Sequence, residues 1–314
     1  MRALIYTVTL NPALDYVLQG EALRFDDINR VRAERFTYGG KGINVSAVLT
    51  TIGVPTTALG FLAGFTGREL AVMLAADGIQ SDFCMLPQGN TRVNVKLKAQ
   101  PPLEFNAQGP AVDEAAVQSL LGKLCNVRDG DSVVLAGAVP PSLPTDIYET
   151  VLKHLQGKDV RVAVDTGGEV LRRTLPYRPF LIKPNHHELG ALFGENLRTE
   201  AELLRCARLL QAQGARNVLV SRAEDGALLL TEQGNVYTVG NADGTAVNTV
   251  GCGDSMVAGF LAGYLKTQDY AYALRLGTAC GNATAFSHGL ADREAIDRAF
   301  SQLHNQVKDE SRGL

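Results

Sequence analysis

Two glycine-rich loops of this sequence carry residues that can bind an anion and move a proton. The first, 249–255, reads TVGCGDS and runs into a helical pattern. Gly251, Cys252 and Gly253 predict an anion hole for a transferring phosphoryl group, because their backbone amides can point at one spot beside a helix amino terminus. Asp254 could take a proton from an attacking hydroxyl, or it could simply cap the helix. The local pattern leaves both interpretations open.

The second loop, 38–45, reads YGGKGINV and precedes another helical run. Three glycines around Lys41 let backbone amides approach a ligand closely. A tight turn that only caps the helix is the alternative. Asn44 favours a ligand, because a side-chain amide can bind sugar hydroxyls both as donor and as acceptor. A Walker A loop is excluded, because the residues around Lys41 lack the required first glycine and the following Ser or Thr.

A third candidate segment, 183–189, reads KPNHHEL and follows an apolar run. Asn185 and Glu188 fall three residues apart at a predicted helix start and so face one way. Such a pair suits magnesium-bound water or phosphate oxygens. His186 and His187 are half of a zinc site at most, since adjacent residues diverge on a helix and no H-E-x-x-H is present. They are predicted to lie in an exposed turn.

The elements that must position these loops alternate between strands and helices. Apolar runs rich in β-branched residues predict strands at 4–10, 57–61, 132–136, 160–165, 180–183 and 217–221. Amphipathic stretches predict helices at 113–125, 144–155, 200–213, 255–265, 270–286 and 293–307. This alternation predicts an α/β fold with a mostly parallel sheet. The polar residues 308–314 are predicted to fray.

Residues 13–38 and 90–107 break this alternation. Both are extended, and TRVNVKLKA at 91–99 alternates with period two, as a strand with one covered face does. We interpret the two segments as a small β lid over the edge of the main sheet. No Gly/Ser linker or internal repeat marks a boundary, so residues 1–314 are expected to form a single domain.

Composition excludes several classes of protein. The 314 residues carry 30 Lys and Arg against 33 Asp and Glu, a net charge of −3, which argues against a nucleic-acid binder. The five cysteines form no C-x-x-C pair and predict reduced thiols.

No apolar run approaches the ~18 residues of a membrane span, and the amino terminus is predicted to form a first strand. A cytoplasmic location without membrane contact is therefore expected. A dinucleotide-binding fingerprint is excluded, because Met256 stands where its third glycine belongs.

Together and in this order, these segments resemble the PfkB (ribokinase-like) family of carbohydrate kinases. The resemblance runs from TLNPALD at 9–15 through GGKGINV, TRVNVK, VPPSLP, IKPNHHEL and TVGCGD to TAFSHGL at 284–290. TLNPALD with GGKGIN is similar to the hexose-phosphate branch, the 1-phosphofructokinases and tagatose-6-phosphate kinases. The resemblance implies a ribokinase-like three-layer α/β/α fold whose β lid also serves as a homodimer contact.

The resemblance further implies ATP-dependent phosphorylation of a phosphosugar hydroxyl, assisted by Mg²⁺. The expected reaction converts fructose 1-phosphate to fructose 1,6-bisphosphate, with tagatose 6-phosphate as the alternative acceptor. A sugar-phosphate sensor that keeps the fold without catalysis is the alternative of another class. Asp254 disfavours a sensor, because a sensor does not need a base.

Individual roles follow from the same resemblance. Asp254 matches the catalytic base, and the anion hole matches Gly251, Cys252 and Gly253. The positions that match the family's substrate-binding residues are Asp15, Gly39, Gly40, Lys41, Asn44 and, in the lid, Arg92. The positions that match its ATP-binding residues are Lys183, Asn185, Glu188, Ser221, Gly226, Gly253 and Asn282. Glu188 is expected near Mg²⁺, through water.

The sequence departs from the family's usual pattern at five positions. Cys252 replaces Ala: the helix amino terminus would depress the pKa of its thiol, or the side chain could be inert, since a free cysteine often behaves as a buried hydrophobe. Ala223 replaces a glycine of the nucleotide loop. Ala136 and Ala138 replace serines, and Gly167 replaces another. These departures bear on substrate identity and rate, but none removes a reacting group.

Overall fold

The computed structural model describes residues 3–24, 26–100, 102–304 and 306–311. The strands of its large sheet are β1 (Ile5–Thr9), β4 (Thr56–Ala63), β5 (Cys84–Leu86), β8 (Ser132–Ala136), β9 (Arg161–Asp165), β10 (Leu181–Ile182), β11 (Asn217–Ser221), β12 (Ala227–Leu230), β13 (Val236–Val239) and β14 (Lys308–Asp309). Within the described residues their order is β14-β13-β12-β11-β10-β9-β8-β1-β4-β5. Pairing is parallel from β5 to β11 and antiparallel from β11 to β14. The predicted mostly parallel sheet is confirmed.

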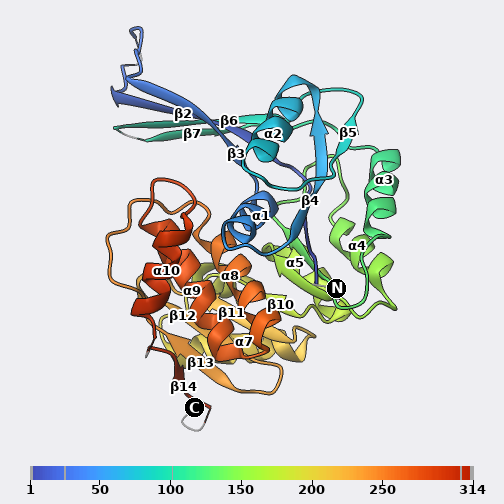
Figure 1. Cartoon of the computed structure of the whole chain (residues 1–314), viewed down its shortest axis with the longest axis vertical. Coiled ribbons are helices and arrows are strands. Elements are labelled where there is room, and N and C mark those ends of the chain that lie inside the picture. Colours follow the sequence, from blue (N-terminus) through green and yellow to red (C-terminus); the bar gives the residue numbers. More distant parts are fainter. Residues whose placement is uncertain (1–2, 25, 101, 305, 312–314) are drawn as a thin grey trace.

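Helices cover both faces of this sheet. They are α1 (Lys41–Thr51), α2 (Gly64–Ala76), α3 (Glu114–Leu124), α4 (Ile147–Leu155), α5 (Gly168–Thr174), α6 (His186–Phe193), α7 (Glu200–Ala212), α8 (Cys252–Thr267), α9 (Tyr270–Ala285) and α10 (Arg293–Gln302), with short 3₁₀ turns η1 (Leu175–Tyr177) and η2 (Ala223–Asp225). Helices α8, α9 and α10 pack on one face, and α3, α4 and α7 pack on the other (Figure 1). None of the described helices is both long and apolar enough to span a bilayer.

The central strand β8 shows why three layers form. Val133 and Leu135 belong to the hydrophobic core on one face of the sheet, whereas Val134 and Ala136 belong to the core on the other. Successive side chains of a strand point to opposite faces, so an uninterrupted apolar run needs helices on both sides. The predicted three-layer α/β/α fold is confirmed.

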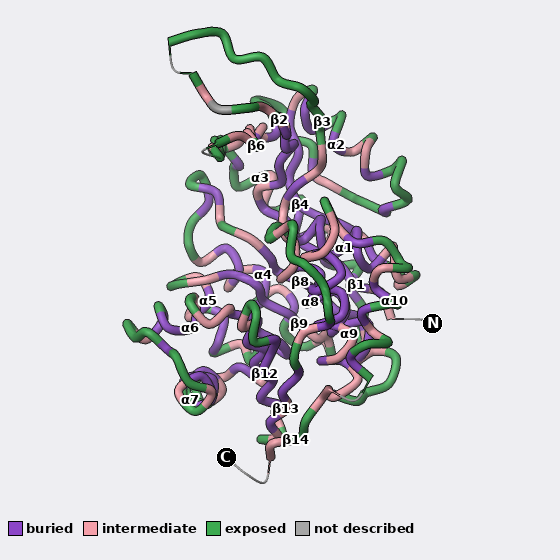
Figure 2. Tube along the Cα trace, turned by 90° about the vertical axis from the view of Figure 1, so that its left-hand side faces the viewer, coloured by how far each residue is buried: buried purple, intermediate pink, exposed green. Residues whose placement is uncertain are grey.

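A second, four-stranded sheet forms the lid. Its strands are β2 (Ala13–Ala22), β3 (Ala33–Gly39), β6 (Arg92–Gln100) and β7 (Leu103–Asn106), in the order β3-β2-β6-β7. The central pair β2–β6 is parallel, and both outer pairs are antiparallel. The sheet projects beyond the body, and the end of its β2–β3 hairpin is exposed (Figures 1 and 2). The lid expected from the two extended segments is present as a small sheet.

Some predicted bounds were wrong. Helix α10 ends at Gln302 rather than 307, because the fully buried Leu303 turns the chain into the core. Strands β12 and β13 were not predicted. Residues 308–309 do not fray but pair with β13, because an edge strand offers backbone groups whatever the side chains are. Residues 312–314 of the predicted frayed end lie outside the described residues.

Candidate active site

A cavity of 1390 Å³ lies where the lid sheet meets the carboxyl ends of the parallel strands. It brings together every residue to which the family resemblance assigned a role: Asp15, Gly39, Gly40, Lys41, Asn44, Arg92, Lys183, Asn185, Glu188, Ser221, Gly226, Gly251, Cys252, Gly253, Asp254 and Asn282. Ligands of doubly wound sheets bind at this end of the strands. The separate roles of these residues remain predictions.

The anion-hole segment forms the first turn of α8. Gly251 is its amino-terminal cap and adopts a φ of 82°, a left-handed conformation that favours glycine. The first-turn amides of Cys252 and Gly253 have no partner within an α-helix, so they are free to bind an anion. A β-carbon at Gly253 would lie 3.0 Å from Nζ of Lys183, so this ammonium group sits against the first turn. The segment combines backbone donors with a fixed cation.

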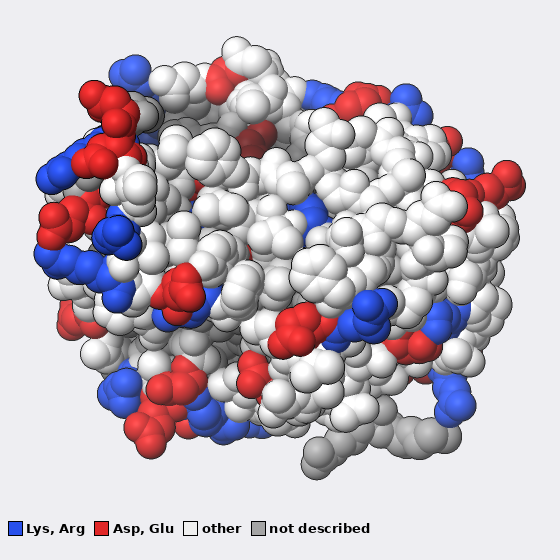
Figure 3. Space-filling model, turned by 90° about the horizontal axis from the view of Figure 1, so that it is seen from above, with Lys and Arg blue, Asp and Glu red and all other residues white. Residues whose placement is uncertain are grey.

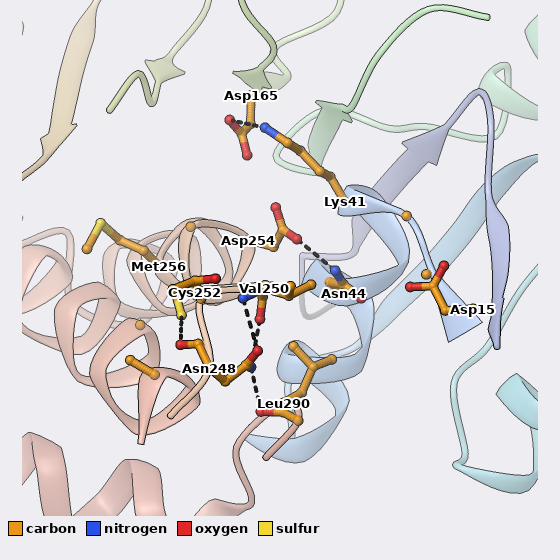
Figure 4. Close-up of a pocket in the computed structure, with 18 of the residues that line it drawn as sticks. Asp15, Lys41, Asn44, Asp165, Asn248, Val250, Cys252, Asp254, Met256 and Leu290 are labelled. Atoms are coloured by element: carbon orange, nitrogen blue, oxygen red, sulfur yellow. Dashed lines mark hydrogen bonds and ion pairs between the residues drawn. The ribbon is translucent and has the colours of Figure 1, made fainter. Parts of the chain in front are cut away.

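Asp254 does not cap its helix. Its side chain is 5% exposed, and its Oδ2 accepts a 2.8 Å hydrogen bond from Nδ2 of Asn44 in α1 (Figure 4). Burial, and then the negative charge of Asp165, raise its pKa to about 6, against the opposing effects of Asn44 and Lys41. A carboxylate with this pKa is ionised at neutral pH yet basic enough to accept a proton. The structure therefore disfavours the capping interpretation.

Two lysines converge on one buried carboxylate behind the anion hole. Oδ1 of Asp165 lies 3.2 Å from Nζ of Lys41 and 3.4 Å from Nζ of Lys183 (Figure 4 shows the Lys41 pair). Burial alone would raise the pKa of Asp165, but Lys183 and Lys41 outweigh it and hold this pKa below its usual range. Burial likewise works against the charge of Lys41, but Asp165, Asp254 and Glu188 outweigh it and raise the pKa of Lys41. Asp165 and Lys41 are therefore both charged at neutral pH.

The lid contributes a polar inner surface to the cavity. Asp15 is 6% exposed, and it accepts hydrogen bonds from Nδ2 of Asn94 at 2.8 Å and from Nζ of Lys96 at 2.6 Å. Nε of Arg92 donates to the carbonyl oxygen of Asn11 at 3.1 Å, and burial lowers the pKa of its guanidinium. The predicted substrate-binding residues of the lid are thus already held in a hydrogen-bonded network.

Two of the residues predicted to bind ATP lie at the start of α6, at one end of the cavity. Asn185 and Glu188 form a capping box: Oδ1 of Asn185 accepts from the Glu188 amide, and Oε2 of Glu188 accepts from the Asn185 amide, each at 2.8 Å. The two side chains therefore fix the helix start as well as lining the cavity. His187 is exposed, as predicted, and His186 is half-buried, but the two residues belong to a helix rather than to a turn. They occupy the first turn of α6, with ring centroids 3.9 Å apart, and both line the cavity.

The remaining predicted nucleotide residues surround η2 and α9. Ser221 ends β11, and Gly226 follows η2. Between them Ala223 adopts a φ of 50°, so the chain keeps a left-handed conformation here without the usual glycine. Asn282 is 9% exposed, and its Oδ1 accepts from the Ala242 amide at 2.8 Å, which anchors the loop after β13 to α9.

The structure favours the inert interpretation of Cys252 over a thiol with a pKa depressed by the helix amino terminus. Burial, and then the neighbouring Asp254, raise its pKa to about 11. Its Sγ donates a 3.5 Å hydrogen bond to the carbonyl oxygen of Asn248 (Figure 4). The helix dipole would lower the pKa of this thiol, but burial and the carboxylate of Asp254 raise it more, because both disfavour the charged thiolate.

The sequence reasoning missed Asp165, Asn94 and Lys96 as site residues. Asp165 ends a buried parallel strand, and that position alone could have signalled a ligand-facing side chain. Asn94 and Lys96 share the period-two spacing of Arg92 in TRVNVKLKA, so they belong to the same face of the strand.

Comparison with known proteins agrees with this geometry. The profile of the pfkB family carbohydrate kinase matches residues 9–296. The chain is 42% identical to the 1-phosphofructokinase of Bacillus subtilis (strain 168) over 96% of its own length and 98% of that protein's. It is 35% identical to the D-tagatose-1-phosphate kinase of Bacillus licheniformis, over 96% and 98% of the two chains. Its structure is similar to that of Escherichia coli phosphofructokinase-2 in complex with fructose-6-phosphate, with a TM-score of 0.88 and 26% identity over 96% and 99% of the two chains. The chain therefore belongs to the pfkB family of carbohydrate kinases.

Proposed function

We propose that this protein transfers the γ-phosphoryl group of ATP to the 6-hydroxyl of fructose 1-phosphate, as a 1-phosphofructokinase. Membership of the family makes it an ATP-dependent sugar kinase. The observation that carries the proposal is the buried carboxylate of Asp254, with a pKa of about 6, at the first turn of α8. A sensor would gain nothing from a carboxylate that burial destabilises in this way, so the observation also disfavours the non-catalytic alternative.

In this proposal the oxygen of the sugar 6-hydroxyl attacks the γ-phosphorus of ATP, and Asp254 takes the proton of that hydroxyl. The bond between the γ-phosphorus and the bridging oxygen breaks, and ADP leaves with this oxygen. The first-turn amides of α8 and the ammonium of Lys183 stabilise the negative charge of the transferring group. Lys41 and Arg92 bind the phosphate of the acceptor. The lid over the cavity excludes water that could otherwise hydrolyse ATP.

Mg²⁺ fits the donor set at the nucleotide end. The described residues include no group of three His, Cys, Asp or Glu side chains that could hold a metal ion. Glu188 lines the cavity there and presents a single carboxylate. Mg²⁺ characteristically keeps several waters and is bound by one or two carboxylates plus substrate phosphates, so Glu188 would hold it through water. Bound in this way, Mg²⁺ neutralises charge on the phosphates of ATP.

The acceptor is proposed to be a ketohexose 1-phosphate. Relatives at 42% and 35% identity are named for 1-phosphate substrates, fructose in one case and tagatose in the other. These sugars differ only in the configuration at carbon 4. Tagatose 1-phosphate is therefore a stronger second candidate than tagatose 6-phosphate, the alternative expected from the sequence.

A coupled assay of ADP release tests the proposed function. We expect kcat/KM to be highest for fructose 1-phosphate among the 1- and 6-phosphates of fructose and tagatose and the two unphosphorylated sugars. A preference for a 6-phosphate would overturn the acceptor assignment. ADP release that no acceptor stimulates would overturn the kinase mechanism.

A homodimer through the lid is part of the proposal. Phe36, Tyr16, Val95 and Phe105 form one cross-strand row over all four lid strands. The rings of Tyr16 and Phe36 stack at 4.5 Å, yet Phe36 is 52% and Phe105 59% exposed. Seen from above, charged side chains gather mostly toward the rim of the molecule, and uncharged ones fill much of its middle (Figure 3). A second copy of the sheet would bury this row.

The oligomeric state tests this assignment. Sedimentation equilibrium is expected to give a dimer for the wild type and a monomer for the double variant Phe36→Lys with Phe105→Lys. Phe65→Lys is a matched control, because Phe65 is 66% exposed on α2 rather than on the lid. A wild-type monomer, or dissociation by the control alone, would contradict a dimer through the lid.

A further inference from the structure

Asp165 has no role in the mechanism above, although it lines the cavity and pairs with two of its lysines. It ends β9, is 1% exposed and lines the cavity. Its Oδ1 is within ion-pair distance of both Lys41 and Lys183. A buried carboxylate costs several kcal/mol unless it is paired, so this pairing is what keeps Asp165 ionised.

The two lysines belong to different halves of the cavity. Lys41 is the first residue of α1, in the loop that carries Asn44 and reaches the lid. Lys183 follows β10, and its Nζ lies against the first turn of α8 at Gly253. Asp165 therefore contacts both ammonium groups through one oxygen atom: that of Lys41 on the acceptor side and that of Lys183 beside the anion hole.

The second oxygen of Asp165 indicates more than a structural ion pair. Oδ2 is fully buried and has no hydrogen-bond partner among the described residues. A purely structural buried carboxylate would be expected to have both oxygens satisfied. In Figure 4 the carboxylate of Asp165 meets the ammonium end of Lys41, so the charge of Asp165 is directed at the cations of the cavity.

We propose that Asp165 is a positioning residue for phosphoryl transfer: it holds the ammonium group of Lys41 toward the acceptor phosphate and that of Lys183 toward the anion hole, at the boundary between the acceptor and donor sites. This inference rests on the proposed kinase function. Lysine is a flexible four-carbon chain, and fixing it beforehand lowers the entropic cost of binding a phosphate. Asp165 also acts electrostatically on Asp254 of α8 and Tyr148 of α4, whereas Glu188 of α6 acts on Lys41.

Asp165→Asn tests the proposal, because it keeps the size of the side chain and removes the charge that attracts both lysines. We expect KM for fructose 1-phosphate and KM for ATP each to rise about tenfold, since each substrate meets one of the two lysines. We also expect ADP binding, measured by calorimetry without a sugar, to weaken by a similar factor. A rise in neither KM would overturn the proposal.

Asp131→Asn is the matched control. Asp131 is also a buried aspartate, 8% exposed, but its oxygens accept from the backbone amides of Leu4 and Arg128 and it does not line the cavity. Its replacement is expected to lower the melting temperature and leave both KM values unchanged. If the two variants change KM alike, the effect of Asp165 is structural and the proposal fails.

A double-mutant cycle shows whether Asp165 acts through Lys41. Once Lys41→Met has removed the ammonium group, adding Asp165→Asn should not raise KM for fructose 1-phosphate further, while KM for ATP should still rise. Additive losses for the sugar would overturn the proposed route. If Asp165→Asn does not fold, Asp165→Glu keeps the charge, and it should retain more affinity for ADP than Asp165→Ala.

Failure of this inference is distinguishable from failure of the proposed function. A wild type that does not phosphorylate ketohexose phosphates overturns the function, whereas calorimetry of ADP still tests the contact between Asp165 and Lys183. A fully active wild type whose Asp165→Asn variant binds ADP and sugar phosphate normally overturns only the role of Asp165.

Discussion

The side-chain amide of Asn44 donates a 2.8 Å hydrogen bond to Oδ2 of Asp254, although the two residues lie 210 positions apart in the sequence. This bond joins the first turn of α1 to the first turn of α8. It favours the ionised form of Asp254, while burial favours the protonated form, and the balance leaves the pKa at about 6. The same contact therefore fixes both the direction of the carboxylate and its basicity.

Replacing Asp254 by asparagine is expected to lower kcat by ~10²–10⁴, the usual contribution of a general base. Asparagine has nearly the same shape and still accepts a hydrogen bond from Asn44, so folding and ATP binding should persist. Steady-state kinetics together with calorimetry of ATP check this. A turnover within a few-fold of the wild type would show that Asp254 is not the base.

The same substitution should stabilise the ligand-free protein at neutral pH. The pKa of Asp254 in the folded protein, about 6, is above its unfolded value of 3.8. The folded state therefore holds this proton more tightly, and stability is lost as pH rises from about 4 through 6. Above that window Asp254→Asn avoids the cost of the buried charge and should gain about 1–3 kcal/mol.

Urea unfolding at pH 7.5 and at pH 4 measures this gain. The difference between Asp254→Asn and the wild type should be largest at pH 7.5 and much smaller at pH 4, where Asp254 is neutral in the folded protein. An asparagine variant that is less stable at pH 7.5 would contradict the raised pKa.

The pH profile of kcat/KM should show an acidic limb near pH 6, because only ionised Asp254 accepts a proton. Asn44→Ala should move this limb to higher pH, since it removes a hydrogen bond that lowers the pKa of Asp254. Asn126→Ala is the control, because Asn126 is exposed and does not line the cavity. A limb that stays in place in Asn44→Ala would show that another group titrates.

Lys41→Ala should impair phosphorylated acceptors far more than unphosphorylated ones. A charge-assisted hydrogen bond to a phosphate contributes ~1.5–3 kcal/mol, or about 10- to 150-fold in kcat/KM, which a neutral sugar cannot use. Parallel assays with fructose 1-phosphate and fructose measure the ratio. Equal losses for both would assign Lys41 to ATP or to the fold instead.

Cys252 should react slowly with alkylating agents at neutral pH, because its pKa of about 11 leaves little thiolate. Cys125, which is exposed, is the internal comparison. Mass spectrometry after iodoacetamide treatment at pH 7.5 should find Cys125 modified first, and Cys252→Ala should remain active. Labelling of Cys252 at the rate of Cys125 would contradict a half-buried thiol that stays protonated.

The sequence by itself determined the architecture, because local patterns carry it. Two local patterns suffice to predict a mostly parallel sheet with helices on both sides. One is the apolar run buried on both faces, such as β8, and the other is the amphipathic helix between such runs. The residue types and spacing of the loops at Lys41 and Asp254 indicated anion binding and proton transfer, but left helix capping open as the alternative. The family resemblance then indicated which loops share one ligand.

The tertiary structure decided how those residues are charged and held. Whether Asp254 caps its helix or faces the cavity depends on Asn44, which no local pattern places beside it. The pKa of Cys252 depends on burial and on a neighbouring carboxylate, and both outweigh the helix terminus that the sequence shows. The convergence of Lys41 and Lys183 on one oxygen of Asp165 likewise depends on the packing of three separate segments. Burial and long-range electrostatics are set by packing between distant segments, and a one-dimensional pattern does not contain them.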